Sequence, residues 1–161
     1  MEKKEMQDKV LETLDELGFR TEALDNDVFG FEYENTSLLF MPAGFDNGML
    51  LFCVPGIFPV NEENLWLSAV LMEKINNEIC FIKSYMLGEY LALFYERELF
   101  GDYDLEETIT RMVINLHKAH EMANMYADAL VKKFGPNGEG IFDETEDEDW
   151  TDDELEDDTN D

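Results

Sequence analysis

Basic residues are scarce in this chain: 11 Lys and Arg stand against 39 Asp and Glu in 161 residues, a formal net charge of −28. Such an excess of negative charge repels phosphate groups, so we expect no binding to nucleic acid or to anionic membranes. No uncharged run approaches the roughly 20 apolar residues that cross a bilayer. The first residues are charged, with no apolar stretch behind them, which predicts that the chain has no secretory signal and is cytoplasmic.

Cysteine and histidine are equally rare, with two of each. Cys53 and Cys80 lie in apolar runs without metal-binding spacing, and we expect both to be buried free thiols. His117 and His120 are three residues apart with Glu121 beside them, but no second Cys or His cluster in the sequence would supply a third ligand. The pattern favours packed or boundary histidines, so we expect no metal and no cofactor.

Catalytic motifs are also missing. No serine lies in a Gly-x-Ser-x-Gly elbow, and no glycine-rich phosphate loop opens a helix. Near the C-terminus, Asp143, Thr145, Asp147 and Glu154 have the spacing of EF-hand ligands, but Glu148 occupies the position that requires glycine. We therefore expect that the protein is not an enzyme. The alternative left open is an enzyme whose acidic residues converge only in the fold.

What the sequence does contain is enough apolar material for a core, since 45% of its residues are hydrophobic. The acidic residues are unevenly distributed: thirteen of them, and no basic residue, lie between Asp143 and Asp161. That segment has too little apolar content to offset the entropy of ordering it. We predict a single domain over residues 1–135 and an acidic, disordered tail over residues 136–161.

Hydrophobic periodicity predicts the secondary structure. Apolar residues at helical spacing indicate a first helix, and alternation or short apolar runs then indicate strands. Asp104 and Glu107 fit a capping box at the start of a final helix of roughly thirty residues, a length that suggests packing on more than its own sheet. The predicted elements are helix 3–17, strands 28–33, 37–41 and 49–54, a helix from about 61 to 77, strands 79–84 and 89–96, and helix 105–134.

Short links between these strands favour antiparallel pairing. We therefore predict an α+β fold with an antiparallel five-stranded sheet packed with helices, in the order α-βββ-α-ββ-α. A turn at Glu34–Thr36 would join the first two strands, with Asn35 tolerating a positive φ. Residues 49–54 are apolar throughout, which is typical of a strand covered on both faces, and Pro55 is expected to end it.

The second predicted helix has a broad apolar face, and we do not expect a five-stranded sheet to cover all of it. Leu65, Trp66, Ala69 and Val70 lie on it, and we predict that they contact a partner protein or a second copy of the chain. The last helix also carries several methionines, a residue enriched at interfaces. A homodimer is the assembly we expect, with protein partners of unknown identity.

Two segments resemble a known family. They are Leu71-Met-Glu-Lys-Ile-Asn-Asn-Glu-Ile-Cys-Phe-Ile-Lys83 and Glu89-Tyr-Leu-Ala-Leu-Phe-Tyr95, and Asn76, Phe81 and Leu93 are the matching positions. Their pattern, with the element order, is similar to the YbjN family, a group of proposed bacterial sensory-transduction regulators with a type III secretion chaperone-like fold. The resemblance spans about residues 3–134 and does not account for the acidic tail.

The resemblance implies a domain with helices packed on an antiparallel sheet, often dimeric, without catalytic residues to carry over. Secretion chaperones bind extended segments of client proteins on apolar patches. The sequence thus predicts a non-enzymatic protein-binding module, chaperone-like or regulatory, that binds partners through apolar surface. The alternative function is a hydrolase or metal-dependent enzyme.

Overall fold

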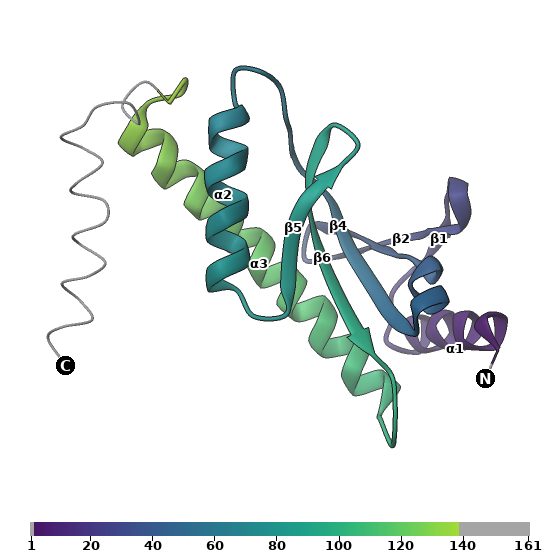
Figure 1. Cartoon of the computed structure of the whole chain (residues 1–161). Helices are drawn as coiled ribbons and strands as arrows, with labels where there is room; N and C mark the ends of the chain where they lie inside the picture. The colour runs from purple at the N-terminus through teal and green to yellow at the C-terminus, as the bar shows by residue number, and fades with distance from the viewer. Residues whose placement is uncertain (1, 139–161) are drawn as a thin grey trace, which may run out of the picture.

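The structure, a computed structural model, describes residues 2–138 as one curved antiparallel sheet with three α-helices (Figure 1). Most of the predicted tail, including the residues with EF-hand spacing, lies outside the described residues. The elements are α1 (Lys3–Glu16), β1 (Glu22–Ala23), η1 (Asp25–Asp27), β2 (Phe29–Tyr33), β3 (Thr36–Phe40), η2 (Pro42–Asn47), β4 (Met49–Pro59), α2 (Leu65–Glu78), β5 (Ile82–Leu87), β6 (Tyr90–Glu98) and α3 (Leu105–Phe134), where η marks a 3₁₀ turn.

The sheet has six strands in the spatial order β1-β2-β3-β4-β6-β5, and every neighbouring pair is antiparallel. The α+β class and the antiparallel sheet are confirmed, whereas the predicted count of five strands is wrong. The additional strand is β1, in which Glu22 pairs with Gly30 and Ala23 with Phe29. Two exposed residues show no hydrophobic alternation, so only pairing with β2 identifies them as a strand.

The β2–β3 hairpin forms as predicted. Its loop consists of Glu34 and Asn35, with φ of 48° and 66°, between the paired residues Tyr33 and Thr36. Positive φ at both loop residues matches the right-handed twist of the strands. This tight loop places Thr36 at the start of β3.

Strand β4 is longer than predicted. It continues past Pro55 to Pro59, and the register with β6 shifts between Val54 and Phe58, which marks an irregularity of the β-bulge kind. The prediction that Pro55 ends this strand is therefore wrong. Proline is compatible with a strand at such an irregularity, where no ladder hydrogen bond needs its missing N–H.

Helix α3 begins and ends as predicted. The Asp104 side chain accepts a hydrogen bond from the Glu107 N–H at 3.1 Å, but the Glu107 carboxylate pairs with Arg111 at 2.6 Å instead of closing the capping box. Its buried stripe lies against the sheet in the first half and against α2 in the second (Figure 1). Helix α2 begins at Leu65, later than predicted, because Asn61 accepts from the N–H groups of Glu63 and Asn64 in a preceding turn.

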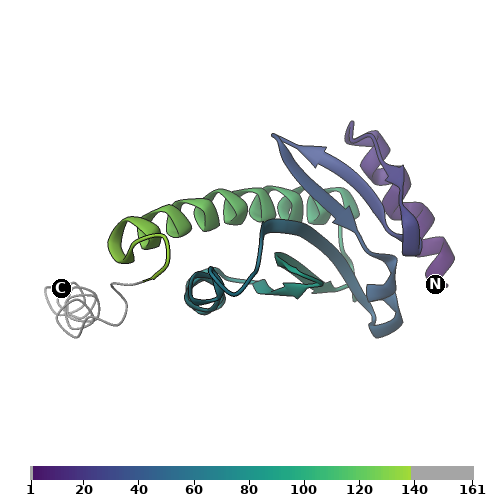
Figure 2. The same cartoon turned by 90° about the horizontal axis from the view of Figure 1, so that it is seen from above.

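One face of the sheet carries the main core. Helices α1 and α3 lie on the same side of it, and α2 packs beside the β5 edge and on α3 (Figure 2). Within residues 2–138, no helix is both long and apolar enough to cross a membrane. The fully buried large side chains are Leu14, Leu38, Phe40, Leu50, Phe52, Leu71, Ile75, Leu91, Leu93, Ile109, Met112 and Leu116.

Candidate functional site

The second face of the sheet has no helical layer. Strand alternation and register place a separate apolar cluster on it, centred on Cys53, Ala92 and Phe94, and no α-helix within the described part of the chain packs there (Figure 2). Cys53, Ala92 and Phe94 are nonetheless buried, because neighbouring side chains cover them, so residues 49–54 are covered on both faces as predicted, although only one face carries a helical layer. We call this surface the bare face; it consists of Gly30, Glu32, Ser37, Leu39, Leu51, Cys53, Pro55, Lys83, Tyr85, Leu87, Ala92, Phe94 and Glu96.

A groove of about 660 Å³ crosses the β2–β3 half of the bare face. Its floor is at Gly30, where an added Cβ would lie 3.1 Å from Leu24 Cδ1 and 3.8 Å from Leu39 Cδ2. Because Gly30 has no side chain, Leu24 folds over it and stays 44% exposed at the groove. The groove is thus a shallow apolar channel that a larger residue at Gly30 would partly fill.

One wall of the groove forms where β3 separates from β4. The two strands pair at Leu39 with Cys53 and at Phe40 with Phe52. In the same register the next outward-facing partner of Ser37 would be Pro55, which has no N–H to donate. The ladder therefore ends there, and Pro55 becomes part of the groove lining.

The centre of the bare face is neutral and tightly packed. The Tyr85 ring lies parallel to Phe94, with centroids 3.9 Å apart and an interplanar angle of 6°. Burial raises the pKa of Cys53 to about 12, so this thiol stays protonated at neutral pH. Burial, followed by the charge of Glu96, also raises the pKa of Tyr85. Tyr85 remains 41% exposed and covers neighbours that would otherwise meet water.

The two cysteines differ, although the sequence predicted both to be buried. Cys53 is buried, but Cys80 is exposed. The reason is that β5 begins at Ile82, so Cys80 lies in the turn after α2 and not in a strand. No disulfide links them, and Cys80 is an accessible thiol.

The predicted interface residues on α2 divide into two groups. Leu65 is 59% exposed and Ala69 is exposed, while Trp66 and Val70 are half-buried. The Trp66 ring packs edge-on against Phe134, with centroids 6.4 Å apart, and Gly138 lies against the indole. Trp66 thus contacts its own chain, and a role of this face in binding stays a prediction.

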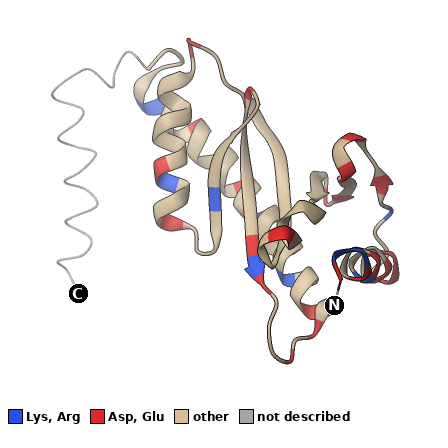
Figure 3. Cartoon of the chain, turned by 45° about the vertical axis from the view of Figure 1, so that its right-hand side comes forward, with Lys and Arg blue, Asp and Glu red and all other residues tan. Residues whose placement is uncertain are grey.

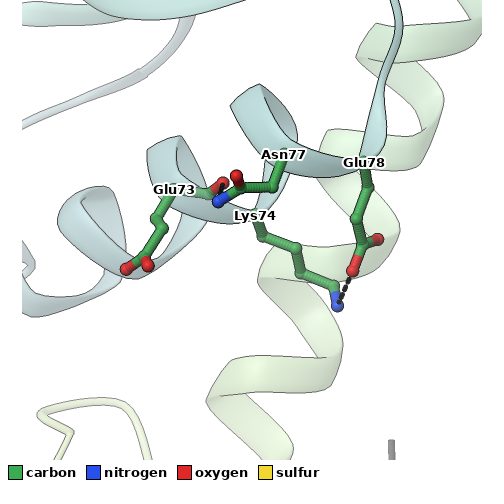
Figure 4. Close-up of polar contacts among 4 residues, drawn as sticks. All are labelled: Glu73, Lys74, Asn77 and Glu78. Atoms are coloured by element: carbon green, nitrogen blue, oxygen red, sulfur yellow. Dashed lines mark hydrogen bonds and ion pairs between the residues drawn. The ribbon is translucent and has the colours of Figure 1, made fainter.

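Near the C-terminal end of α2, polar side chains connect this helix to the second half of α3. Lys74 pairs with Glu78 at 2.9 Å (Figure 4), and its ammonium lies 4.9 Å from the ring centroid of Tyr126 on α3. The hydrogen bond from Lys74 lowers the pKa of Glu78. Burial and the hydrogen bond to Glu78 raise the pKa of Tyr126. The second half of α3 therefore packs on α2, which agrees with the expectation that so long a helix packs on more than its own sheet.

Both histidines converge on one hydroxyl. Thr36 Oγ1 lies 2.8 Å from His117 Nδ1 and 3.2 Å from His120 Nδ1, and His117 Nε2 lies 2.6 Å from Glu121 Oε1. The Tyr33 ring packs on the His117 ring at 87°. Burial, then the charge of His117, lowers the pKa of His120, partly opposed by Glu121. A hollow of about 430 Å³ opens beside the cluster, between the hairpin loop and α3.

In the part of the chain that the structure describes, no three His, Cys, Asp or Glu residues are placed to hold a metal ion, whether at the histidine cluster or away from it. From the sequence, the histidine cluster could be recognised only as two histidines on one predicted helix. Its third member, Thr36, is 81 residues from His117, and no periodicity links them. The bare face was also missed, because apolar residues on both sides of a strand do not reveal whether a second layer exists.

No protein-family model matches this chain, and no curated protein matches it in sequence. Among solved structures, YbjN of E. coli, a proposed transcription regulator, is similar, with a TM-score of 0.59, 15% identity and coverage of 76% of this chain and 91% of that chain. An uncharacterized protein of Methanothermobacter thermautotrophicus is also similar, with a TM-score of 0.54, 14% identity and coverage of 76% and 96%. These likenesses show a shared fold, which agrees with the resemblance to YbjN seen in the sequence.

Proposed function

We propose that the protein is a non-enzymatic protein-binding module, chaperone-like or regulatory, and that the bare face receives the partner. The observation that carries this proposal is the groove lined by Leu24 and Leu39, together with the exposed Tyr85 ring, on a sheet face without a covering α-helix in residues 2–138. Contiguous apolar surface of this kind marks interaction sites more often than it remains idle. A regulatory role is proposed for YbjN, whose fold the chain shares.

Charge favours a basic partner over a second copy of the chain at this face. The protein carries a net charge of −28, and the bare face with its groove holds the carboxylates of Glu22, Glu32 and Glu96 against Arg20 and Lys83. The central parts of β4, β5 and β6 carry few charges (Figure 3). An apolar peptide segment flanked by Lys or Arg therefore complements both the centre and the surroundings of the face.

The test uses an immobilised library of 15-residue peptides with one apolar centre flanked by Lys and Arg, by Ser, or by Asp and Glu. The basic-flanked peptides should bind best, and Leu39→Lys and Tyr85→Lys should each weaken binding at least tenfold. Met125→Lys is the matched control, because Met125 is 69% exposed on α3 and lies away from the bare face. Higher salt should reduce the preference for basic flanks.

Three results would overturn the proposal. The first is binding that the two bare-face variants leave unchanged, and the second is no binding to any peptide. The third is a dimer of the protein alone, seen by light scattering, that Leu39→Lys dissociates, since this would assign the bare face to a second copy. The homodimer expected from the sequence would instead use the outer side of α2, around Leu65 and Ala69.

A hydrolase is the second candidate function, and one arrangement of three side chains favours it. Thr36, His117 and Glu121 form a hydroxyl–imidazole–carboxylate series like that of acyl-transfer enzymes. Thr36 is only 2% exposed, however, so a substrate has little access to the hydroxyl. Hydrolysis of a generic p-nitrophenyl ester that Thr36→Val abolishes would support this candidate over the binding module.

A further inference from the structure

We propose that His120, Thr36 and His117 form a relay that takes up one proton from the hollow beside α3 and places its charge on His117, next to Glu121. The proposal rests on the geometry of the cluster and is independent of what the bare face binds. It gives the protein a proton-sensitive contact between the β2–β3 hairpin and α3.

The starting state follows from the donors and acceptors. An ionised carboxylate can only accept, so the 2.6 Å contact of Glu121 requires a proton on His117 Nε2. A neutral His117 then has a lone pair on Nδ1, which accepts the Thr36 hydroxyl proton at 2.8 Å. The Thr36 oxygen in turn accepts from His120, so His120 carries its proton on Nδ1.

This assignment leaves the lone pair of His120 Nε2 as the entry point. The imidazole belongs to the lining of the hollow, together with the hairpin residues Glu34 and Asn35 and the α3 residues Glu121 and Asn124. Glu34 and Glu121 are the charged side chains in that lining, and both favour a proton nearby. The Tyr33 ring covers part of His117 on the hairpin side.

Uptake of one proton reverses the series of hydrogen bonds. A proton from solvent binds His120 Nε2, the His120 Nδ1 proton moves to Thr36 Oγ1, and the original hydroxyl proton moves to His117 Nδ1. His120 ends as the neutral Nε2–H tautomer, Thr36 again has one hydroxyl proton, and His117 carries the positive charge beside Glu121. Every donor in the series still has an acceptor after the transfer, so the hairpin stays attached to α3.

A second proton cannot be accommodated in the same way. Both Nδ1 atoms would then donate to Thr36 Oγ1, its hydroxyl proton would have no acceptor within the cluster, and two imidazolium ions would lie side by side. Repulsion between them and partial burial oppose this state, in agreement with the lowered pKa of His120. The pair therefore takes up one proton as a unit, and the contact weakens only when the second one binds.

The experiment records nitrogen-15 and proton NMR spectra of the histidine rings in the full chain from pH 8 to pH 5. At pH 8 we expect the Nε2–H tautomer at His117 and the Nδ1–H tautomer at His120. As the first proton binds, His117 should become doubly protonated while His120 changes to the Nε2–H tautomer without gaining charge. A His120 that keeps one tautomer throughout, or two independent titrations, would contradict the relay.

Matched variants separate the relay from simple proximity. Thr36→Val preserves the shape of the side chain but removes the hydroxyl, so the tautomer change at His120 should be lost. Thr36→Ser retains the hydroxyl and should retain the change. Glu121→Gln should lower the pH at which the first proton binds, because it removes the carboxylate charge beside His117. If Thr36→Val does not fold, an unaltered His120 response in Glu121→Gln and in Thr36→Ala would still overturn the proposal.

Discussion

The side-chain amide of Asn76 pairs with both backbone groups of Ser84, as a neighbouring strand would. Ser84 N–H donates to Asn76 Oδ1 at 2.6 Å, and Asn76 Nδ2 donates to the Ser84 carbonyl at 3.2 Å. Ser84 lies in β5, which is an edge strand of the sheet. One residue of α2 therefore blocks a backbone position that could otherwise pair with another chain.

Asn76→Ala should lower the free energy of unfolding by about 1–3 kcal/mol, because it leaves the Ser84 backbone groups without partners. Asn77→Ala is the control, since Asn77 Nδ2 bonds only the Glu73 carbonyl of its own helix (Figure 4). Urea titration measures both variants, and hydrogen exchange at the Ser84 amide should accelerate in Asn76→Ala alone. Equal effects of the two substitutions would contradict this role of Asn76.

Phe81 has a backbone conformation that suits glycine. Its φ is +67° and its ring is 77% exposed, although it stacks on Tyr95 at 6.2 Å. Phe81→Gly should stabilise the protein by about 0.5–1 kcal/mol, because the left-handed region costs a residue with a Cβ about 1 kcal/mol. Phe81→Ala keeps that cost and loses the stacking, so it should be neutral or destabilising. If thermal unfolding shows Phe81→Gly to be no more stable than Phe81→Ala, the left-handed backbone at this position carries no relievable strain.

The two thiols should react at different rates. Cys80 is exposed and Cys53 is buried with a pKa raised to about 12. Since the thiolate is the reactive form, a maleimide at pH 7.5 should modify Cys80 within minutes and Cys53 only after unfolding. Mass spectrometry should find one label in the native protein and two in urea. Rapid double labelling without denaturant would show that the bare face opens readily.

Stability should fall as the pH drops below about 6.5, the usual pKa of histidine. The pKa of His120 is lowered in the folded state, chiefly by burial. Between the two values the unfolded chain binds more protons than the folded one, so acid favours unfolding. His120→Gln should show a smaller decrease in the urea midpoint between pH 7.5 and pH 5.5 than the unsubstituted protein. An identical decrease in both would exclude His120 as its source.

The homodimer predicted from α2 can be tested at its exposed residue. Leu65 is 59% exposed, whereas Trp66 packs on Phe134. If a dimer forms, Leu65→Asp should dissociate it without loss of helical circular dichroism, while Trp66→Asp should destabilise the monomer itself. Light scattering decides between a mass near 18.7 kDa and twice that value. A monomer at low micromolar concentration would exclude this interface.

Elements with local signals could be located from the amino-acid sequence. Apolar residues at helical spacing located α1 and α3, Asp104 and Gly135 defined the ends of α3, and the loop of Glu34 and Asn35 defined the hairpin. These signals depend on backbone preferences and on periodicity within a few turns, which do not require knowledge of distant contacts.

Tertiary structure alone decided the features on which the proposed functions depend. The strand β1 exists because β2 pairs with it, and β4 continues past Pro55 because β6 supports it beyond the irregularity. Whether a helical layer covers the side of the sheet that holds Cys53 and Phe94 depends on where the helices pack. Alternation along a strand shows which residues share a face, but it does not show what covers that face. Thr36 meets His117 and His120 because the hairpin folds onto α3, and a contact across more than eighty residues has no trace in local propensity.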